Sequence, residues 1–261
     1  MIEALLFNAA LLLAMALALW LVSLAIHKVG FVDAFWGGAM TVLALASFLQ
    51  LERRGDLAIL ICGMTVLWGA RLAVHLLRRF LRSGEDERYR KLLSGDRFWF
   101  GSLVKVFLLQ SVLIVLVSSP AQVGILSAGR APGLPPLALA GLALWLIGVV
   151  FEWVGDWQLA RFKADPANEG KVMDKGLWRY TRHPNYFGDA CVWWGIWLAC
   201  AATGWPNALW TVAGPVFLTF TLTRWSGAAM TEKGMRAKYG DAFADYVRRT
   251  PAFVPGPPRG G

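Results

Sequence analysis

Residues 176–189 combine basic, aromatic and amide side chains in one short run, Gly-Leu-Trp-Arg-Tyr-Thr-Arg-His-Pro-Asn-Tyr-Phe-Gly-Asp. The apolar stretch Ala190–Thr203 follows directly, so the run lies at the mouth of a membrane segment. Charges are costly there, and cations, hydrogen-bond donors and ring faces are what an anionic cofactor needs. Pro184 suits the first turn of a helix, whose N-terminus adds partial positive charge. Asn185 and Asp189 would share one face of that helix.

Two carboxylates precede this run at the end of another apolar segment. Glu152 and Asp156 are four residues apart, so they share one helix face at the membrane rim. Ionisable groups at that depth normally face a cavity or a partner. They indicate either part of a cofactor site or a structural pairing with Arg161 or Arg182.

A third group of polar residues follows the last apolar segment. It comprises Arg224–Gly227, then Glu232 and Tyr246, and ends with the cations Arg248 and Arg249. Cations suit the negative end of a terminal helix, which is the structural interpretation. The functional interpretation is a lid that closes over a nucleotide.

The N-terminal half carries its own ionisable residues inside apolar surroundings. Asp33 lies within an expected membrane helix, Arg71 and His75 share a face of the next one, and Glu85 and Tyr89 follow it. These residues indicate either ion pairs that only stabilise the structure or a group of polar side chains at the bottom of a substrate pocket.

Composition indicates the elements that must position these residues. The chain has 261 residues, 57% hydrophobic and 16% charged, whereas soluble domains carry roughly 25% charged residues. We therefore expect an all-α integral membrane protein with seven transmembrane helices and a short cytosolic C-terminal helix. The expected spans are about Ala4–Ile26, Val29–Gln50, Leu57–Leu77, Phe98–Ser119, Pro136–Gln158, Tyr186–Thr203 and Pro206–Leu222, with the last helix at about Met230–Val247.

Charge distribution predicts the orientation. Counting the loops between expected spans, 21 Lys and Arg residues lie on one side and three on the other. The positive-inside rule places the C-terminus and the cofactor site in the cytosol and the N-terminus outside. The net charge of +9 fits a polyanionic cofactor, or attraction to anionic membrane lipids. The three cysteines are isolated in apolar segments and predict no metal site.

At this point the residues resemble a known family. Gly176–Asp189, Arg224–Glu232 and Tyr239–Pro251 are similar to the C-terminal domain of the membrane steroid 5α-reductase superfamily, and most similar to its bacterial branch. Phe31–Gly38 and Gly84–Tyr89 also look like that branch. The His-Pro-Asn-Tyr-x-Gly-Asp core is shared with sterol C14 reductases, so it indicates fold and cofactor better than substrate.

The resemblance implies a bacterial inner-membrane reductase in which residues 131–261 bind NADPH and residues 1–130 form the pocket of a hydrophobic steroid or lipid enone. It implies no nucleic acid and no obligate protein partner. Carried over by motif, the cofactor-binding residues are Arg79, Arg88, Asp156, Lys163, Trp178, Tyr180, His183, Asn185, Asp189, Arg224, Ser226, Glu232 and Tyr246.

The sequence differs from the eukaryotic steroid reductases at the positions that bind the substrate ketone. Those enzymes use an acidic residue and a tyrosine, where Trp36–Gly38 and Leu76 stand here. Asp33, Glu85 and Tyr89 are therefore the expected catalytic residues. The expected reaction is hydride transfer from NADPH to the β-carbon of the conjugated ketone, followed by protonation of the α-carbon.

Two other functions remain open. Membrane S-adenosylmethionine methyltransferases of the isoprenylcysteine or phospholipid type carry a similar Arg-His-Pro-x-Tyr turn. Asn185, Asp189 and the many cations favour a cofactor with three phosphates instead. A lipid-binding scaffold would explain the hydropathy but not the polar run at residues 176–189.

Overall fold

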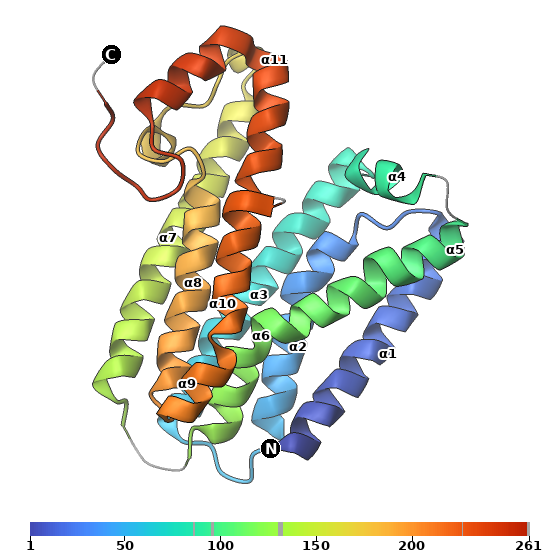
Figure 1. The fold of residues 1–261 in the computed structure, drawn as a ribbon, viewed down its shortest axis with the longest axis vertical. Helices are drawn as coiled ribbons and strands as arrows, with labels where there is room; N and C mark the ends of the chain where they lie inside the picture. Colours follow the sequence, from blue (N-terminus) through green and yellow to red (C-terminus); the bar gives the residue numbers. More distant parts are fainter. Residues whose placement is uncertain (86, 95–96, 130–132, 226, 260–261) are drawn as a thin grey trace. The chain divides into compact units, whose positions relative to one another are not determined.

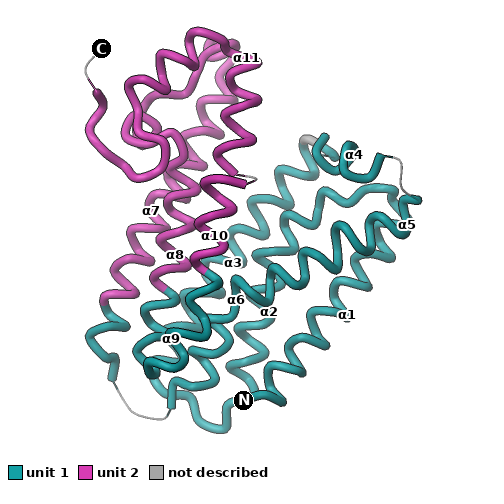
Figure 2. Tube along the Cα trace, viewed as in Figure 1, with its two compact units in different colours: residues 1–139, 196–214 teal, residues 140–195, 215–261 magenta. Residues whose placement is uncertain are grey.

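The computed structural model describes residues 1–261 except 86, 95–96, 130–132, 226 and 260–261, and no strand occurs in the described part. The helices form two compact units, shown in Figure 2. Unit 1 comprises Met1–Leu139 and Ile196–Gly214, and unit 2 comprises Ala140–Gly195 and Pro215–Gly261. The chain leaves unit 1, forms part of unit 2 and returns, so the two units interleave along the sequence. The assignment of substrate to residues 1–130 and nucleotide to residues 131–261 stays a prediction.

Unit 1 contains α1 (Ile2–Ile26), α2 (Val32–Leu49), α3 (Asp56–Ser83) and α4 (Glu87–Leu93), which are labelled in Figure 1. A continuous helical run follows, made of α5 (Phe98–Gly101), the π-helix η1 (Ser102–Leu108) and α6 (Leu109–Ser127). The short α9 (Trp205–Thr211) also belongs to this unit.

Close backbone contact holds α2 against α3. A Cβ on Gly37 would lie 2.4 Å from the carbonyl oxygen of Gly69, and one on Gly69 would lie 2.6 Å from that of Gly37. Small residues let membrane helices approach this closely, because lipid supplies no hydrophobic force between them. This contact joins the second turn of α2 to the middle of α3.

A buried polar cluster joins α1, α2 and α6. Asn8 Nδ2 donates to Ser47 Oγ at 2.8 Å and to Gln122 Oε1 at 2.9 Å, while Gln50 Nε2 donates to Asn8 Oδ1 at 3.0 Å. Ser118 Oγ accepts from Gln122 Nε2. Polar side chains between apolar helices must pair with one another, so this cluster selects one register for the three helices.

Unit 2 contains most of α7 (Pro136–Ala164), the first two-thirds of α8 (Pro184–Ala201), most of α10 (Ala213–Phe220), the π-helix η4 (Thr221–Trp225) and α11 (Ala228–Arg249). Two single-turn 3₁₀ segments, η2 (Pro166–Asn168) and η3 (Gly176–Arg179), lie between α7 and α8. Within α11, Gly240 has φ 51° and ψ −125°, which breaks the helix. The helix expected at about Met230–Val247 corresponds to α11, which extends beyond both of these ends and is divided at Gly240.

Glycines spaced seven residues apart bring α7 and α8 together. A Cβ on Gly188 would lie 2.4 Å from the backbone nitrogen of Glu152, and one on Gly148 would lie 2.6 Å from the carbonyl oxygen of Gly188. One on Gly195 would lie 2.6 Å from the carbonyl oxygen of Gly141. Two helices in backbone contact over two turns form a stiff support for the polar residues at the start of α8.

Among the described residues, five helical segments are long and apolar enough to cross a membrane: α1, α2, α3 to Arg82, the run Phe98–Ser127, and α7. The expected span at Tyr186–Thr203 coincides with α8, which is not among these five. The span expected at Pro206–Leu222, which Pro215 was expected to break, is divided in the structure. The chain there forms α9, α10 and η4, because Pro215 has no N–H to bond Thr211 and the helix breaks at Val212. The total of seven spans stays a prediction.

Candidate functional site

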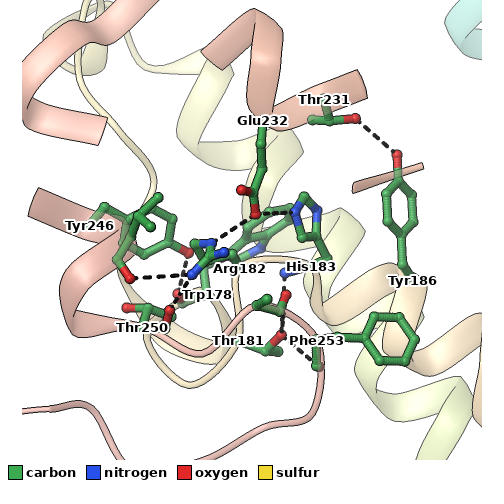
Figure 3. Close-up of polar contacts among 12 residues, drawn as sticks. Trp178, Thr181, Arg182, His183, Tyr186, Thr231, Glu232, Tyr246, Thr250 and Phe253 are labelled. Carbon is green, nitrogen blue, oxygen red and sulfur yellow. Dashed lines mark hydrogen bonds and ion pairs between the residues drawn. The ribbon is translucent and has the colours of Figure 1, made fainter. Parts of the chain in front are cut away.

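Arg182 is the centre of the polar network in unit 2 (Figure 3). Its Nε donates to Glu232 Oε1 at 2.8 Å, and its Nη1 donates to the carbonyl oxygens of Thr250 at 2.6 Å and Val247 at 3.3 Å. Its backbone N–H donates to the carbonyl oxygen of Pro251 at 2.9 Å. One arginine therefore joins the start of α8 to both ends of α11.

His183 shares the carboxylate of Glu232. Its Nε2 lies 3.1 Å from Glu232 Oε1, the histidine is 4% exposed, and its ring stacks on Tyr186 with centroids 5.3 Å apart. Burial by itself would raise the pKa of Glu232, but hydrogen bonds and charge from His183 and Arg182 outweigh it and hold this pKa at about 2. Glu232 is thus an anion at neutral pH, and it fixes the orientation of both side chains.

The segment at residues 250–256, here called the C-terminal strap, runs beside residues 179–182. Thr181 Oγ1 donates to the carbonyl oxygen of Phe253 at 2.8 Å, and the Gly256 N–H donates to the carbonyl oxygen of Tyr180 at 3.0 Å. The side chain of Tyr180 itself is exposed. The strap is therefore held by backbone groups as well as by Arg182.

Trp178 and Tyr246 form two further hydrogen bonds within unit 2. Tyr246 donates its hydroxyl proton to the carbonyl oxygen of Trp178, and Trp178 Nε1 donates to the carbonyl oxygen of Gly155 at 3.0 Å. Both side chains are buried, and burial raises the pKa of Tyr246. Their polar groups are occupied within the unit, and their assignment to a cofactor stays a prediction.

A pocket of about 420 Å³ borders the network. Its lining residues come from the start of α8, η4, α11 and the strap: Arg182, Thr223, Arg224, Ala228, Ala229, Glu232, Ala252 and Phe253. Arg182 donates to protein acceptors through Nε and Nη1, and Arg224, an exposed residue of η4, is a second cation that lines this pocket.

The other expected cofactor residues of this unit lie on α7, α8 and the loop after η4. Asn185 Nδ2 donates to Asp156 Oδ1 at 3.1 Å, and Asp189 lies one turn further along α8. Lys163 is exposed at the end of α7. Ser226 lies outside the described residues. Asp156 is thus bound to Asn185, which differs from the structural pairing with Arg161 or Arg182 considered above.

A second polar cluster lies in unit 1, where α2, α3 and α4 meet. Tyr89 Oη donates to Asp33 Oδ1 at 2.5 Å, and Arg88 Nη2 lies 3.3 Å from Asp33 Oδ2. Tyr89 is buried at 8% exposure, whereas the carboxylate of Asp33 is 29% exposed. Two of the three expected catalytic residues therefore form one hydrogen-bonded pair.

Glu85 lies beside the same pair and holds the loop before α2. Its Oε2 accepts from the backbone N–H groups of Val29 at 3.0 Å and Gly30 at 3.1 Å. Its Oε1 is buried and has no hydrogen-bond partner within the described part of the chain. A small cavity of about 80 Å³ opens here, lined by Gly30, Asp33, Leu76, Arg79, Phe80, Gly84 and Glu85.

The structure thus sorts the expected site residues into two clusters. Asp33, Glu85 and Tyr89 lie together in unit 1 with Arg79 and Arg88, which the sequence analysis assigned to the cofactor. In unit 2, His183, Arg224 and Glu232 lie around one pocket or its network. The contribution of Arg79 and Arg88 to cofactor binding stays a prediction.

Sequence reasoning did not assign Arg182, Thr181 and the C-terminal strap to the site. Arg182 was visible as a cation in the run at residues 176–189, but its partners are mostly backbone carbonyls 65 and 68 residues away. Carbonyl groups carry no residue identity, so no sequence pattern predicts them. The side chains of His183 and Glu232 were the sequence signals that pointed to this network.

Comparison with known proteins places the chain in a family. The family model described as "Protein of unknown function (DUF1295)" matches residues 19–250. The chain belongs to this family. It is also a member of the membrane steroid 5α-reductase superfamily that the motifs indicate.

Among curated relatives, 3-oxo-5-alpha-steroid 4-dehydrogenase 1 of Rattus norvegicus is 31% identical over 120 residues, covering 46% of this chain and 42% of the relative. The Homo sapiens protein of the same name is 29% identical over 120 residues, again 46% and 42%. The chain therefore matches less than half the length of these enzymes. An uncharacterised protein of Schizosaccharomyces pombe is 25% identical over 272 residues, covering 91% of this chain and 75% of the relative.

Proposed function

We propose that this protein is a membrane reductase that uses NADPH to reduce the double bond conjugated to the ketone of a hydrophobic substrate, a 3-keto-4-ene steroid or a similar lipid enone. The observation that carries the proposal is the 31% identity to 3-oxo-5-alpha-steroid 4-dehydrogenase 1. The relatives' names favour this function over a methyltransferase.

The pocket of unit 2 fits part of a dinucleotide phosphate. Its volume of about 420 Å³ lies within the usual range for small-molecule sites, roughly 300–1,000 Å³. Arg224 would bind a phosphate, and the Phe253 ring gives the same pocket an apolar surface. Asn185 and Asp189, on the first turns of α8, would bind amide or hydroxyl groups of the nucleotide. NADPH, when bound, supplies the hydride.

The cluster of unit 1 would bind the substrate ketone. In our proposal the hydroxyl proton of Tyr89, which lies on Asp33 Oδ1, turns to the ketone oxygen as negative charge develops there. Arg88 beside Asp33 Oδ2 balances the charge of the carboxylate that remains. Glu85 orders the backbone at Val29 and Gly30 and so shapes this end of the pocket.

The protein would lie in a bacterial inner membrane with its C-terminus in the cytosol. The concentration of cations in the loops that adjoin α3, α7 and α11 supports this orientation. NADPH is a cytosolic cofactor, so the pocket of unit 2 is expected on that side.

Thermal unfolding of the detergent-purified protein tests the proposal. NADPH should raise the midpoint more than NADH does, and S-adenosylmethionine should leave it unchanged. With NADPH present, a 3-keto-4-ene steroid should lose its enone absorbance and gain two hydrogens by mass spectrometry. Stabilisation by S-adenosylmethionine alone would contradict the reductase and support the methyltransferase.

A further inference from the structure

A polar contact inside unit 1 lies one helical turn from Asp33 and takes no part in the chemistry proposed above. Trp36 on α2 donates its indole N–H to Gln110 Oε1 on α6 at 2.6 Å. Asp33 and Trp36 are three residues apart, so both side chains lie on the same side of α2. Trp36 stands in the region where eukaryotic relatives have an acidic residue for the substrate ketone.

Gln110 lies on the inner face of α6. It shares that face with Ile114 and Val117, four and seven residues further along, and both of these are fully buried. Gln110 itself is half-buried. It follows directly after the π-helix η1, and π-helical insertions occur frequently at functional sites.

The partner of Gln110 determines which way its amide points. An indole N–H donates and cannot accept, so the atom facing Trp36 must be the amide oxygen. The NH₂ group is consequently directed away from Trp36, and no described residue accepts a hydrogen bond from it. The NH₂ group is not among the buried unpaired atoms of the described residues, so it is accessible, and a ligand oxygen can accept a hydrogen bond from it.

We propose that Gln110 Nε2 donates a hydrogen bond to a second oxygen of the hydrophobic substrate, at the end away from the reducible ketone. This rests on the proposed function in one respect, that Asp33 and Tyr89 bind the ketone at the first turn of α2. Gln110 is then a specificity-determining residue, because it selects lipids that carry a carbonyl or hydroxyl at both ends. Trp36 is a positioning residue that holds the amide in the donating orientation.

Binding of two steroids to the full-length protein tests this. Androst-4-en-3-one and androst-4-ene-3,17-dione share the enone and differ in the distal oxygen, and thermal stabilisation gives an apparent Kd for each without turnover. Wild type should bind the dione about fivefold more tightly, a difference of about 1 kcal/mol for one neutral hydrogen bond. Gln110→Met, which keeps the side-chain length, should remove the preference.

Two further variants separate binding from folding. Gln110→Met leaves the Trp36 N–H unpaired, so Trp36→Phe with Gln110→Met removes both partners and should restore stability while still lacking the preference. Leu109→Met, on the outward face of α6, is the matched control and should keep the preference.

Three outcomes would overturn the inference: wild type binds neither steroid, wild type shows no preference, or Gln110→Met retains it. Turnover bears separately on the proposed function. If both steroids bind with the expected preference but neither is reduced, the proposed reaction is wrong and the Gln110 site stands. If both are reduced and Gln110→Met still prefers the dione, the reaction stands and the Gln110 site is wrong.

Discussion

The polar clusters of the two units are built in opposite ways. In unit 2, Arg182 donates to one carboxylate and three carbonyl oxygens, counting its backbone N–H. In unit 1, Asp33 is 29% exposed, and Glu85 Oε1 has no hydrogen-bond partner among the described residues. The network of unit 2 therefore holds its own chain together, whereas the cluster of unit 1 retains capacity for a ligand.

This difference indicates that the two clusters have different roles. A network in which one side chain joins several segments is rigid, and removing that side chain leaves buried groups unpaired at a large cost in stability. A partly unsatisfied cluster contributes less to stability and can change its hydrogen bonds when a substrate oxygen arrives. Mutations at Arg182 should therefore act mainly on folding, and mutations at Asp33 or Tyr89 should act mainly on turnover.

The largest effect is expected for Arg182→Met. The change leaves Glu232 with His183 alone and frees the carbonyl groups of Val247 and Thr250, so the free energy of unfolding should fall by about 4 kcal/mol. Thermal unfolding measures this, and limited proteolysis should cut the freed strap. Arg248→Met, at a side chain 72% exposed, is the control and should change stability by less than about 1 kcal/mol.

Tyr89→Phe should lower kcat about 100-fold, which corresponds to about 3 kcal/mol in the activation barrier, with little change in the midpoint of unfolding. The hydroxyl proton on Asp33 is the one proposed to reach the ketone oxygen. Steady-state kinetics with an enone steroid measure the effect, and Tyr239→Phe is the matched control. Equal losses of activity and stability would make Tyr89 a structural residue and remove the contrast between the units.

Stability should depend on pH through Glu232. Its pKa is about 2 in the folded protein and 4.5 when unperturbed, so its contribution is complete above pH 4.5 and is lost as the pH falls toward 2. The shift corresponds to about 3 kcal/mol. Unfolding midpoints of wild type and Glu232→Gln should therefore converge between pH 5 and 2. If the difference between the two midpoints stays constant across that range, a group other than Glu232 causes the pH dependence of stability.

The smallest effects are expected at glycines. Gly188→Ala places a Cβ against the Glu152 backbone and should destabilise unit 2 by about 2 kcal/mol. Gly234→Ala, in α11 with nothing within 4 Å of the added Cβ, should stabilise the helix by about 1 kcal/mol. Thermal unfolding of both variants measures the difference. A tolerated Gly188→Ala would mean that the supporting helix pair is not rigid.

Sequence reasoning predicted the helices better than their ends. The fifth expected span ended at Gln158, but α7 continues to Ala164, and α3 continues past Leu77 to Ser83. Hydropathy marks where a helix leaves the lipid, whereas backbone hydrogen bonds continue into the charged turns beyond it. Pro215 predicted the break in the last span, and the interruption lies at Val212 because the missing N–H of Pro215 acts on the preceding turn.

The amino-acid sequence by itself determined the class of protein, the family and the residues able to do chemistry, because hydropathy, charge and motif spacing are properties of the chain. Only the tertiary structure decided which of those residues meet. The pairs Asp33–Tyr89 and Arg182–Glu232 are separated by 56 and 50 residues, and the other acceptors of the Arg182 side chain are backbone carbonyls. Such contacts depend on how helices pack, and packing is set by close backbone approach at glycines such as Gly148 and Gly188.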